Sequence, residues 1–198
     1  MNEPWKRRRI DIGYLLALLI ALPALLPLLR PGYLDSHDGT LHLYRVMGVD
    51  RALHQGMFYP RWLPEFSFGY GYPLLNYYPP LSYYVVETFH ILGFGYILSV
   101  KLAFAAGFLL AAATMYLLAK EFLGRWPALF AAAVYTYLPY HLADGYMRGA
   151  IAEFWAFVFL PLLFWIFYRL GKEHRPRYFV AGAGALGGVI AFETKDAS

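Results

Sequence analysis

The fold of this chain is decided by a run of 18 apolar residues near its beginning, Ile12-Gly-Tyr-Leu-Leu-Ala-Leu-Leu-Ile-Ala-Leu-Pro-Ala-Leu-Leu-Pro-Leu-Leu29. About 20 helical residues cross the hydrocarbon core of a bilayer, so the run predicts a membrane-spanning helix. Lys6-Arg-Arg-Arg9 precedes it, and basic residues mark the cytoplasmic flank of a span. A cleaved signal peptide is the alternative, but the run is long and no small-x-small cleavage site precedes Arg30.

The composition of the whole chain also favours a membrane protein. Hydrophobic residues make up 60% of the 198 residues and charged residues 15%, against roughly 45–50% and 25% in soluble domains. The absence of cysteine excludes disulfides, thiol nucleophiles and cysteine-ligated metals. We therefore predict an all-α, polytopic membrane helix bundle embedded in a lipid bilayer, and we expect no nucleic-acid partner.

Four further hydrophobic stretches follow the first span, at residues 102–119, 127–143, 150–168 and 178–192. If the N-terminus is cytoplasmic, the basic turns Lys120–Arg125 and Arg169–Arg177 are cytoplasmic too, and every strongly basic turn falls on one side. The last stretch is short and is stopped by Glu193-Thr-Lys-Asp196. We expect one membrane domain over residues 1–198, with four full spans and a truncated fifth, in a natural protein that continues further.

The long segment 30–101 is predicted to be an outer loop that carries two interfacial helices. One covers 38–54, with Asp38 or Ser36 near its N-cap. The other covers 81–96 and starts after Pro79-Pro80. Counting the second as a span would move the basic turn at 169–177 outside. Four tyrosines in this region either form an interfacial aromatic belt or stack on sugars: Tyr77, Tyr78, Tyr83 and Tyr84.

The polar stretch Asp35-Ser-His-Asp-Gly-Thr-Leu-His-Leu-Tyr-Arg45 stands directly behind the first span. In a helix that begins at Asp38, the side chains of Asp38, His42 and Arg45 share one face. A carboxylate and an imidazole one turn apart can form a general base with an orienting partner. Asp35 and His37 are a second pair and also a partial metal site. The alternative is an interfacial helix that presents polar groups to headgroups and water.

A second polar stretch, Pro139-Tyr-His-Leu-Ala-Asp-Gly-Tyr-Met-Arg-Gly-Ala-Ile-Ala-Glu153, forms the predicted outer turn between the third and fourth spans. Its Asp144, Arg148 and Glu153 therefore share a membrane face with Asp38. Two acidic outer loops can hold a divalent cation, Mg²⁺ or Mn²⁺, or Arg148 can clamp a phosphate. A capped turn at Asp144 and a helix N-terminus stabilised by Glu153 are the structural alternative. Arg61, in the first loop, is a candidate contact for a lipid phosphate.

A series of motifs across residues 30–180 resembles bacterial membrane proteins labelled 6-pyruvoyl-tetrahydropterin synthase-related. The motifs are His37-Asp-Gly-Thr-Leu-His42, Gly56-Met-Phe-Tyr-Pro-Arg-Trp62, Gly69-Tyr-Gly-Tyr-Pro73 and Tyr78-Pro-Pro-Leu-Ser-Tyr-Tyr84. The wider layout is similar to the C-type (GT-C) glycosyltransferases, which include protein mannosyltransferases and oligosaccharyltransferases. Pro79-Pro-Leu and the turn Ala119-Lys-Glu-Phe-Leu-Gly-Arg125 lie where that superfamily has similar sequences.

The resemblance implies transfer of a sugar from a polyprenyl-phosphate-linked donor to a glycan, lipid or protein acceptor. The reaction would take place at the outer face of a bacterial or archaeal cytoplasmic membrane. The first-loop carboxylate of the superfamily, a base or acceptor orienter, maps onto Asp38, with Asp35 as its rival and His42 as a catalytic neighbour. The second acidic position maps onto Glu153 or Asp144. Candidate substrate-binding residues are Arg45, Arg61, Arg148 and His37. We expect the 198-residue chain alone to be inactive, because its fifth helix is unfinished.

Two other functions remain open at this point, a lipid or polysaccharide transporter component and a non-catalytic membrane scaffold. A transporter is expected to carry polar residues or broken helices near the middle of the membrane. The stretches 102–119 and 150–168 carry almost none, and their charges lie at the ends. This distribution favours chemistry at the membrane surface over transport, and it does not distinguish an enzyme from a scaffold.

Overall fold

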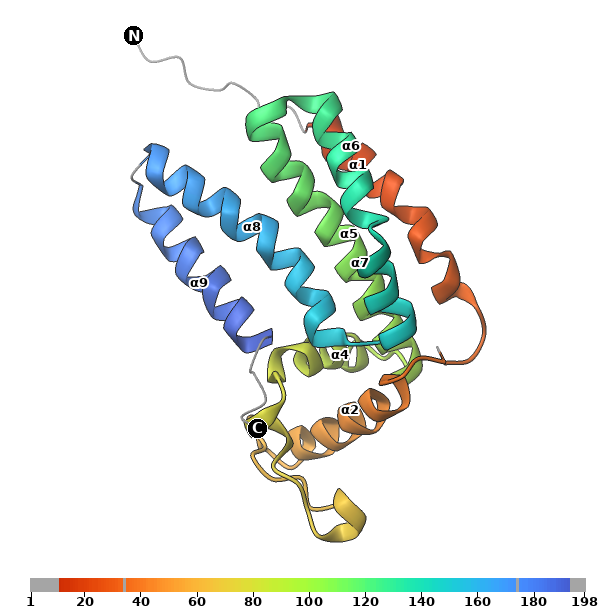
Figure 1. The fold of residues 1–198 in the computed structure, drawn as a ribbon. Coiled ribbons are helices and arrows are strands. Elements are labelled where there is room, and N and C mark those ends of the chain that lie inside the picture. The colour runs from red at the N-terminus through yellow and green to blue at the C-terminus, as the bar shows by residue number, and fades with distance from the viewer. Residues whose placement is uncertain (1–10, 34, 174, 193–198) are drawn as a thin grey trace.

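The computed structural model describes residues 11–33, 35–173 and 175–192, which form a helical bundle with two helices lying across one of its ends (Figure 1). No β-strand occurs in these ranges; Leu63 and Tyr72 form one isolated bridge. The basic segment Lys6–Arg9 and the terminal Glu193–Asp196 lie outside the described residues. Three of the described helices are long and apolar enough to cross a membrane. The predicted all-α membrane helix bundle is thereby confirmed.

The first apolar run is one continuous rod of two helical types. It consists of the α-helix α1, Ile12–Ala21, and the 3₁₀ helix η1, Leu22–Leu29. The side chain of Asp11 caps α1 by accepting a hydrogen bond of 3.0 Å from the amide of Gly13. Pro23 and Pro27 remove two backbone donors from the second half. The rod passes α5 and the α6 helix along the bundle.

The central helix of the bundle is α5, Tyr96–Leu123, which packs against α1, α4, α6 and α8. It is longer than the expected span 102–119 and begins six residues earlier. The expected surface helix 81–96 ends correspondingly earlier, because α4 covers only Pro80–Ile91. The break between them falls at Gly93, whose φ of +99° ends α4. Tyr96 thus begins the long helix instead of ending the surface helix.

The expected third span, 127–143, is divided into shorter pieces. Helix α6 covers Arg125–Thr136, α7 covers Pro139–Ala143, and a π-helical turn, η3, covers Asp144–Arg148. Pro139 has no amide proton and starts a new helix, so α6 cannot continue through it. At 1.5 Å per residue, the 12 residues of α6 extend about 18 Å, which is less than the ~30 Å hydrocarbon core. The expectation of one uninterrupted helix here was wrong.

The bundle is completed by an antiparallel pair at its C-terminal side, α8, Ile151–Glu173, and α9, Pro176–Phe192. The helices crossing the end of the bundle are α2, Gly39–His54, and α4 (Figure 1). Between them the chain forms the short elements η2, Ser67–Gly69, and α3, Leu74–Tyr77. We call this end of the bundle, with residues 30–95 and 137–150, the loop end. The opposite end, with the 123–125 and 173–176 turns, is the turn end.

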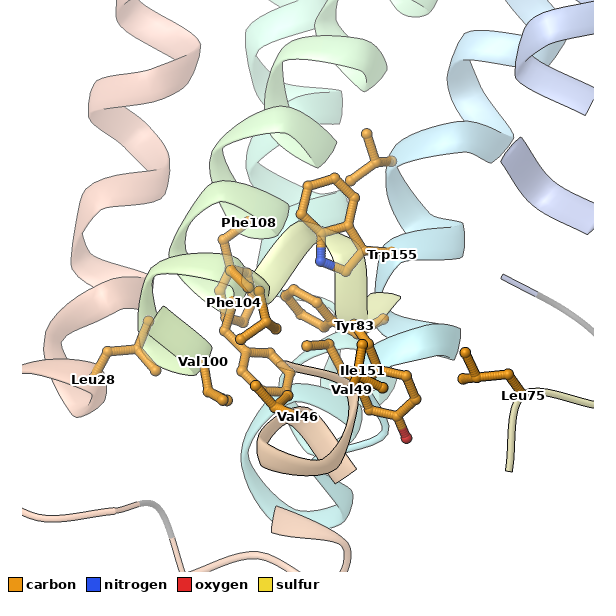
Figure 2. Packing of buried hydrophobic residues seen from close by; sticks show 14 of the residues in the cluster. Leu28, Val46, Val49, Leu75, Tyr83, Val100, Phe104, Phe108, Ile151 and Trp155 are labelled. Atoms are coloured by element: carbon orange, nitrogen blue, oxygen red, sulfur yellow. The ribbon is translucent and has the colours of Figure 1, made fainter. Parts of the chain in front are cut away.

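One hydrophobic core fixes the crossing helices to the bundle (Figure 2). Val46 from α2 and Tyr83 from α4 are buried against Phe104 and Phe108 from α5 and Ile151 from α8. Tyr83 has no exposed surface, so it belongs to this core and not to an interfacial aromatic belt. Because apolar burial contributes about 25 cal/mol per Å², this shared core stabilises the packing of α2 and α4 against the ends of α5 and α8.

The turn end is tied together by charge. The Asp11 carboxylate forms ion pairs with Lys120 and, at 3.2 Å, with Arg125. Arg169 pairs with Glu121 at 3.1 Å. The two described basic turns therefore lie at the same end of the bundle, and the polar segments 35–45 and 139–153 meet at the other.

Candidate functional site

The first loop is docked onto the turn before α8 through its backbone. The amide of His37 donates to the carbonyl of Met147, and the amide of Asp38 donates to the carbonyl of Arg148, each at 2.9 Å. Gly149 permits this approach because it adopts a left-handed conformation, with φ 68° and ψ 25°. A Cβ at this glycine would lie 3.1 Å from the Cβ of Ser36 and closer still to its hydroxyl. The two polar stretches of the sequence thus meet at one place.

Arg148 is the centre of a cluster of polar side chains at this junction. Its Nη1 lies 2.9 Å from Asp144 Oδ1 and 2.7 Å from Glu153 Oε2. The same nitrogen donates to the Tyr140 hydroxyl at 3.0 Å, and that hydroxyl donates to Glu153. The π turn sets the spacing, since the amide of Gly149 bonds the Asp144 carbonyl at 2.9 Å. Such turns occur frequently at functional sites.

Asp144 is a buried carboxyl group with a perturbed titration. It has no exposed surface. Apart from the ion pair with Arg148, whose geometry is not that of a hydrogen bond, neither of its oxygens has a hydrogen-bond partner within the described ranges. The pKa of Asp144 is raised to about 7, chiefly by burial and then by the charge of Glu153; Arg148 opposes the shift, and Asp38 adds to it. Asp38 is joined to this cluster by the hydrogen bond from its amide to the carbonyl of Arg148. A carboxyl with this pKa can hold or release a proton near neutral pH.

His42 points into the core between α2 and α4 instead of toward Asp38. Its Nδ1 is 3.1 Å from the Tyr83 hydroxyl, and its Nε2 is 3.3 Å from the Tyr78 hydroxyl. Burial, and after it the charge of Arg45, lower the pKa of His42 to about 3. The imidazole is therefore neutral at physiological pH, with both nitrogens occupied. This geometry suits a group that positions the two tyrosines.

Arg45 carries a positive charge that no carboxylate neutralises among the residues the structure describes. Its Nη1 donates to the Tyr83 hydroxyl at 3.3 Å, and its guanidinium lies over the Tyr78 ring, 4.7 Å from the ring centre. The half-buried carboxylate of Asp38 likewise has no hydrogen-bond or ion-pair partner in the described ranges. Among the described residues, the carboxylate of Asp38 and the guanidinium of Arg45 thus form no ion pair, unlike the groups of the Arg148 cluster.

The other predicted site residues lie at its edge or apart from it. The side chains of Asp35 and His37 are exposed, and only the backbone of His37 takes part in the docking. Arg61 is exposed on the loop, with its guanidinium 6.0 Å from the Tyr59 ring centre. The structure thus brings Asp38 to Asp144, Arg148 and Glu153. It places Arg45 against Tyr78 and Tyr83, and it leaves Asp35 and Arg61 outside both groups.

Sequence reasoning did not single out Tyr140 or Gly149, and it left the roles of Tyr78 and Tyr83 open. A signal existed for Gly149, since a glycine that follows the last turn of a helical segment often adopts positive φ. No comparable signal separates Tyr83, which bonds His42, from Tyr84, whose hydroxyl donates to the carbonyl of Phe58.

The residues predicted to bind a divalent cation are arranged in a way that does not fit one. Asp144 and Glu153 both face the guanidinium of Arg148, which occupies the position between them. Across the described ranges, no group of three or more His, Cys, Asp or Glu side chains is arranged to hold a metal ion. A divalent cation at Asp144 and Glu153 would have to displace Arg148. The predicted binding of Mg²⁺ or Mn²⁺ stays a prediction.

The fold and this cluster define a helical membrane protein with a mixed acidic and basic site at one end of its bundle. In a comparison with protein families, residues 78–197 match the family described as dolichyl-phosphate-mannose-protein mannosyltransferase. This match covers more than half of the chain, and the chain belongs to that family. No curated protein and no solved structure matches it. The family supports the resemblance to GT-C enzymes; the pterin-synthase-related label is not confirmed by it.

Proposed function

We propose that the protein is a glycosyltransferase that transfers a sugar from a polyprenyl-phosphate-linked donor to an acceptor hydroxyl at the outer membrane face. Membership in a mannosyltransferase family supports the lipid-linked donor. The observation that carries the proposal is the hydrogen bond of 2.9 Å from the Asp38 amide to the Arg148 carbonyl. It brings an unpaired carboxylate to a partly exposed polar cluster at the loop end, where a membrane-bound donor and an aqueous acceptor can meet.

Asp38 is the proposed general base. As the acceptor oxygen attacks the anomeric carbon of the donor sugar, its proton passes to the Asp38 carboxylate. A bond forms between the acceptor oxygen and the anomeric carbon, while the bond from that carbon to the phosphate oxygen breaks. The electron pair leaves with the polyprenyl phosphate. A half-buried carboxylate without an ion-pair partner suits this role, because no neighbour has to be displaced before it accepts the proton.

Arg45 is the proposed contact for the leaving phosphate. Its guanidinium is fixed by the Tyr83 hydroxyl and the Tyr78 ring and has no carboxylate partner in the described ranges. It can therefore stabilise the charge that develops on the phosphate oxygen. Arg148 is less suited, because two carboxylates already neutralise it. We assign Arg148 to holding Asp144 and Glu153 in position beside Asp38.

The proposal is tested by Asp38→Asn in the full-length protein, assayed in membrane vesicles with radiolabelled polyprenyl-phosphate mannose as donor. The substitution keeps size and hydrogen-bonding shape but removes the proton acceptor, so transfer should fall about 10²–10⁴-fold. Asp35→Asn is the matched control and should have a much smaller effect, because Asp35 lies outside the cluster. Loss of activity in Asp35→Asn alone would reverse the assignment, and full activity in both variants would remove it.

A further inference from the structure

A groove at the loop end lies apart from the Arg148 cluster. It is a cavity of about 510 Å³ between the loop after η1, one face of α2 and the first turns of α5. Its walls are apolar apart from Lys101, the one charged residue that lines it; they include Gly32, Leu43, Met47, Ile97 and Leu98. On α2, Leu43 and Met47 lie on a different face from His42 and Arg45, which point toward α4.

Lys101 is a buried cation without a counter-ion. The residue is only 8% exposed, and its ammonium donates to the carbonyl of Arg30 at 2.6 Å. Within the described ranges it forms no ion pair with a carboxylate. An ammonium has three N–H donors, so the carbonyl leaves donors unused. Because burying a charge is costly unless it is paired, this arrangement indicates an anionic ligand.

The depth of the groove points to a lipid. Lys101 lies in the second turn of α5, and Arg30 directly follows the first apolar rod, so both mark the end of helices long enough to cross a membrane. This is the level of the phosphate groups of a bilayer. Ile97 and Leu98 of the groove wall are 40% and 46% exposed, which suits contact with hydrocarbon chains.

We propose that this groove binds a bilayer phospholipid, with the Lys101 ammonium on its phosphate and an acyl chain along the apolar wall. A phosphodiester supplies the negative charge that Lys101 lacks, and charge-assisted hydrogen bonds of this kind are the strong ones. Neither Asp38 nor Arg45 lines the groove, so we assign its occupant to a lipid held beside the site and not to the sugar donor. The bound lipid would tie the start of α5 to the end of η1.

The test is native mass spectrometry of the full chain released from detergent micelles, titrated with dihexanoyl phosphatidylglycerol. Lys101→Met, which keeps the length of the side chain but removes its charge, should weaken binding roughly 10-fold or more. Lys101→Arg should retain binding. Lys172→Met is the control, because Lys172 is exposed at the turn end, and it should behave as the unmodified protein.

Two further ligands make the result decisive. Dihexanoylglycerol has the same chains without phosphate; if the unmodified protein binds it equally well, the groove recognises hydrocarbon alone and the proposal fails. Geranyl phosphate represents a prenyl donor, and a roughly 10-fold preference for it would also overturn the proposal by making the groove a donor site. If Lys101→Met does not fold, the comparison of these ligands on the unmodified protein still decides the question.

Discussion

The amide of Asp38 donates a hydrogen bond of 2.9 Å to the carbonyl of Arg148, and this contact joins the two polar segments of the chain. The guanidinium of the same Arg148 holds Asp144 and Glu153. One residue therefore positions the first loop through its backbone and the second acidic pair through its side chain. Changes at this junction should affect the geometry of both.

Gly149→Ala should disrupt the junction. The glycine has a φ of 68°, and a methyl group there would meet Ser36. The left-handed conformation alone costs an alanine about 1–2 kcal/mol, and the collision adds to that. We expect a lower unfolding temperature in detergent and reduced sugar transfer.

The steric and backbone parts of that effect can be separated. The double variant Gly149→Ala/Ser36→Gly should regain only the stability lost to the collision with the Ser36 side chain. Gly32→Ala is the control, because Gly32 has a φ of +80° with no atom within 4 Å of an added Cβ. Equal effects of Gly32→Ala and Gly149→Ala on activity would argue against a specific role of the junction.

Arg148→Gln should destabilise the protein more than Glu153→Gln. Above pH 7, where Asp144 is ionised, this buried carboxylate loses its only positive partner in the described ranges, and breaking a buried pair from one side costs about 3–5 kcal/mol. Glu153 is 37% exposed at its side chain and can be hydrated. In chemical unfolding experiments, the double variant Arg148→Gln/Asp144→Asn should regain most of the free energy of unfolding that Arg148→Gln loses. No recovery in the double variant would mean that Arg148 acts through its backbone neighbours instead.

Chelation of divalent cations should leave sugar transfer within about 2-fold of its starting rate. The physical reason is that Arg148 already neutralises the two carboxylates at close range. The measurement is transfer in vesicles before and after EDTA, with and without added Mg²⁺ or Mn²⁺. A loss that only the added cation restores would support the earlier prediction of a metal at Asp144 and Glu153.

The sequence predicted the fold class because a membrane span is recognised by the mean hydropathy of a whole stretch of residues, which depends on composition alone. It also predicted the surface helix that the structure places at Gly39–His54, because Asp38 and Ser36 are residue types that favour a helix N-cap. It missed the break at Pro139. The residues on both sides are apolar and continue the hydrophobic stretch, and a proline can either kink a helix or start one. It placed the start of α5 too late, because Lys101 looked like a boundary although the helix buries it.

For the candidate site, sequence spacing placed Asp144, Arg148 and Glu153 near one another, since they are neighbours along one turn. It could not assign the partner of His42. Helical periodicity put His42 on the Asp38 face, whereas the packing of α4 against α2 supplies Tyr78 and Tyr83 as its partners. Contacts between helices distant in sequence depend on tertiary packing, which no local pattern encodes.

The orientation in the membrane can be tested by labelling introduced cysteines in this cysteine-free chain. Ser67→Cys lies on the exposed loop and Lys172→Cys at the turn end, and both positions are exposed. We expect an impermeant maleimide added outside intact cells to label position 67 and to label position 172 only after permeabilisation, because basic turns favour the cytoplasm. Labelling at 172 but not at 67 would invert the proposed topology.

Stability should fall as pH rises toward 7, because of Asp144. Its pKa is raised from 3.8 to about 7, mainly by burial. Between these values the folded state therefore holds a proton that the unfolded state has lost. By linkage, the free energy of unfolding decreases as pH rises from about 4 to about 7 and then levels off. At about 1.4 kcal/mol per pKa unit, the loss is on the order of 4 kcal/mol.

Asp144→Asn should remove this dependence of stability on pH. The measurement is the free energy of unfolding of the variant and of the unmodified protein, each obtained by chemical unfolding at pH 4.5 and at pH 7.5. The asparagine variant should be less affected by the change of pH and, at pH 7.5, the more stable of the two. Asp35→Asn is the control, because Asp35 is exposed and lies outside the cluster, and it should keep the slope of the unmodified protein. An identical slope in Asp144→Asn would show that the carboxyl stays ionised in the fold, held by Arg148.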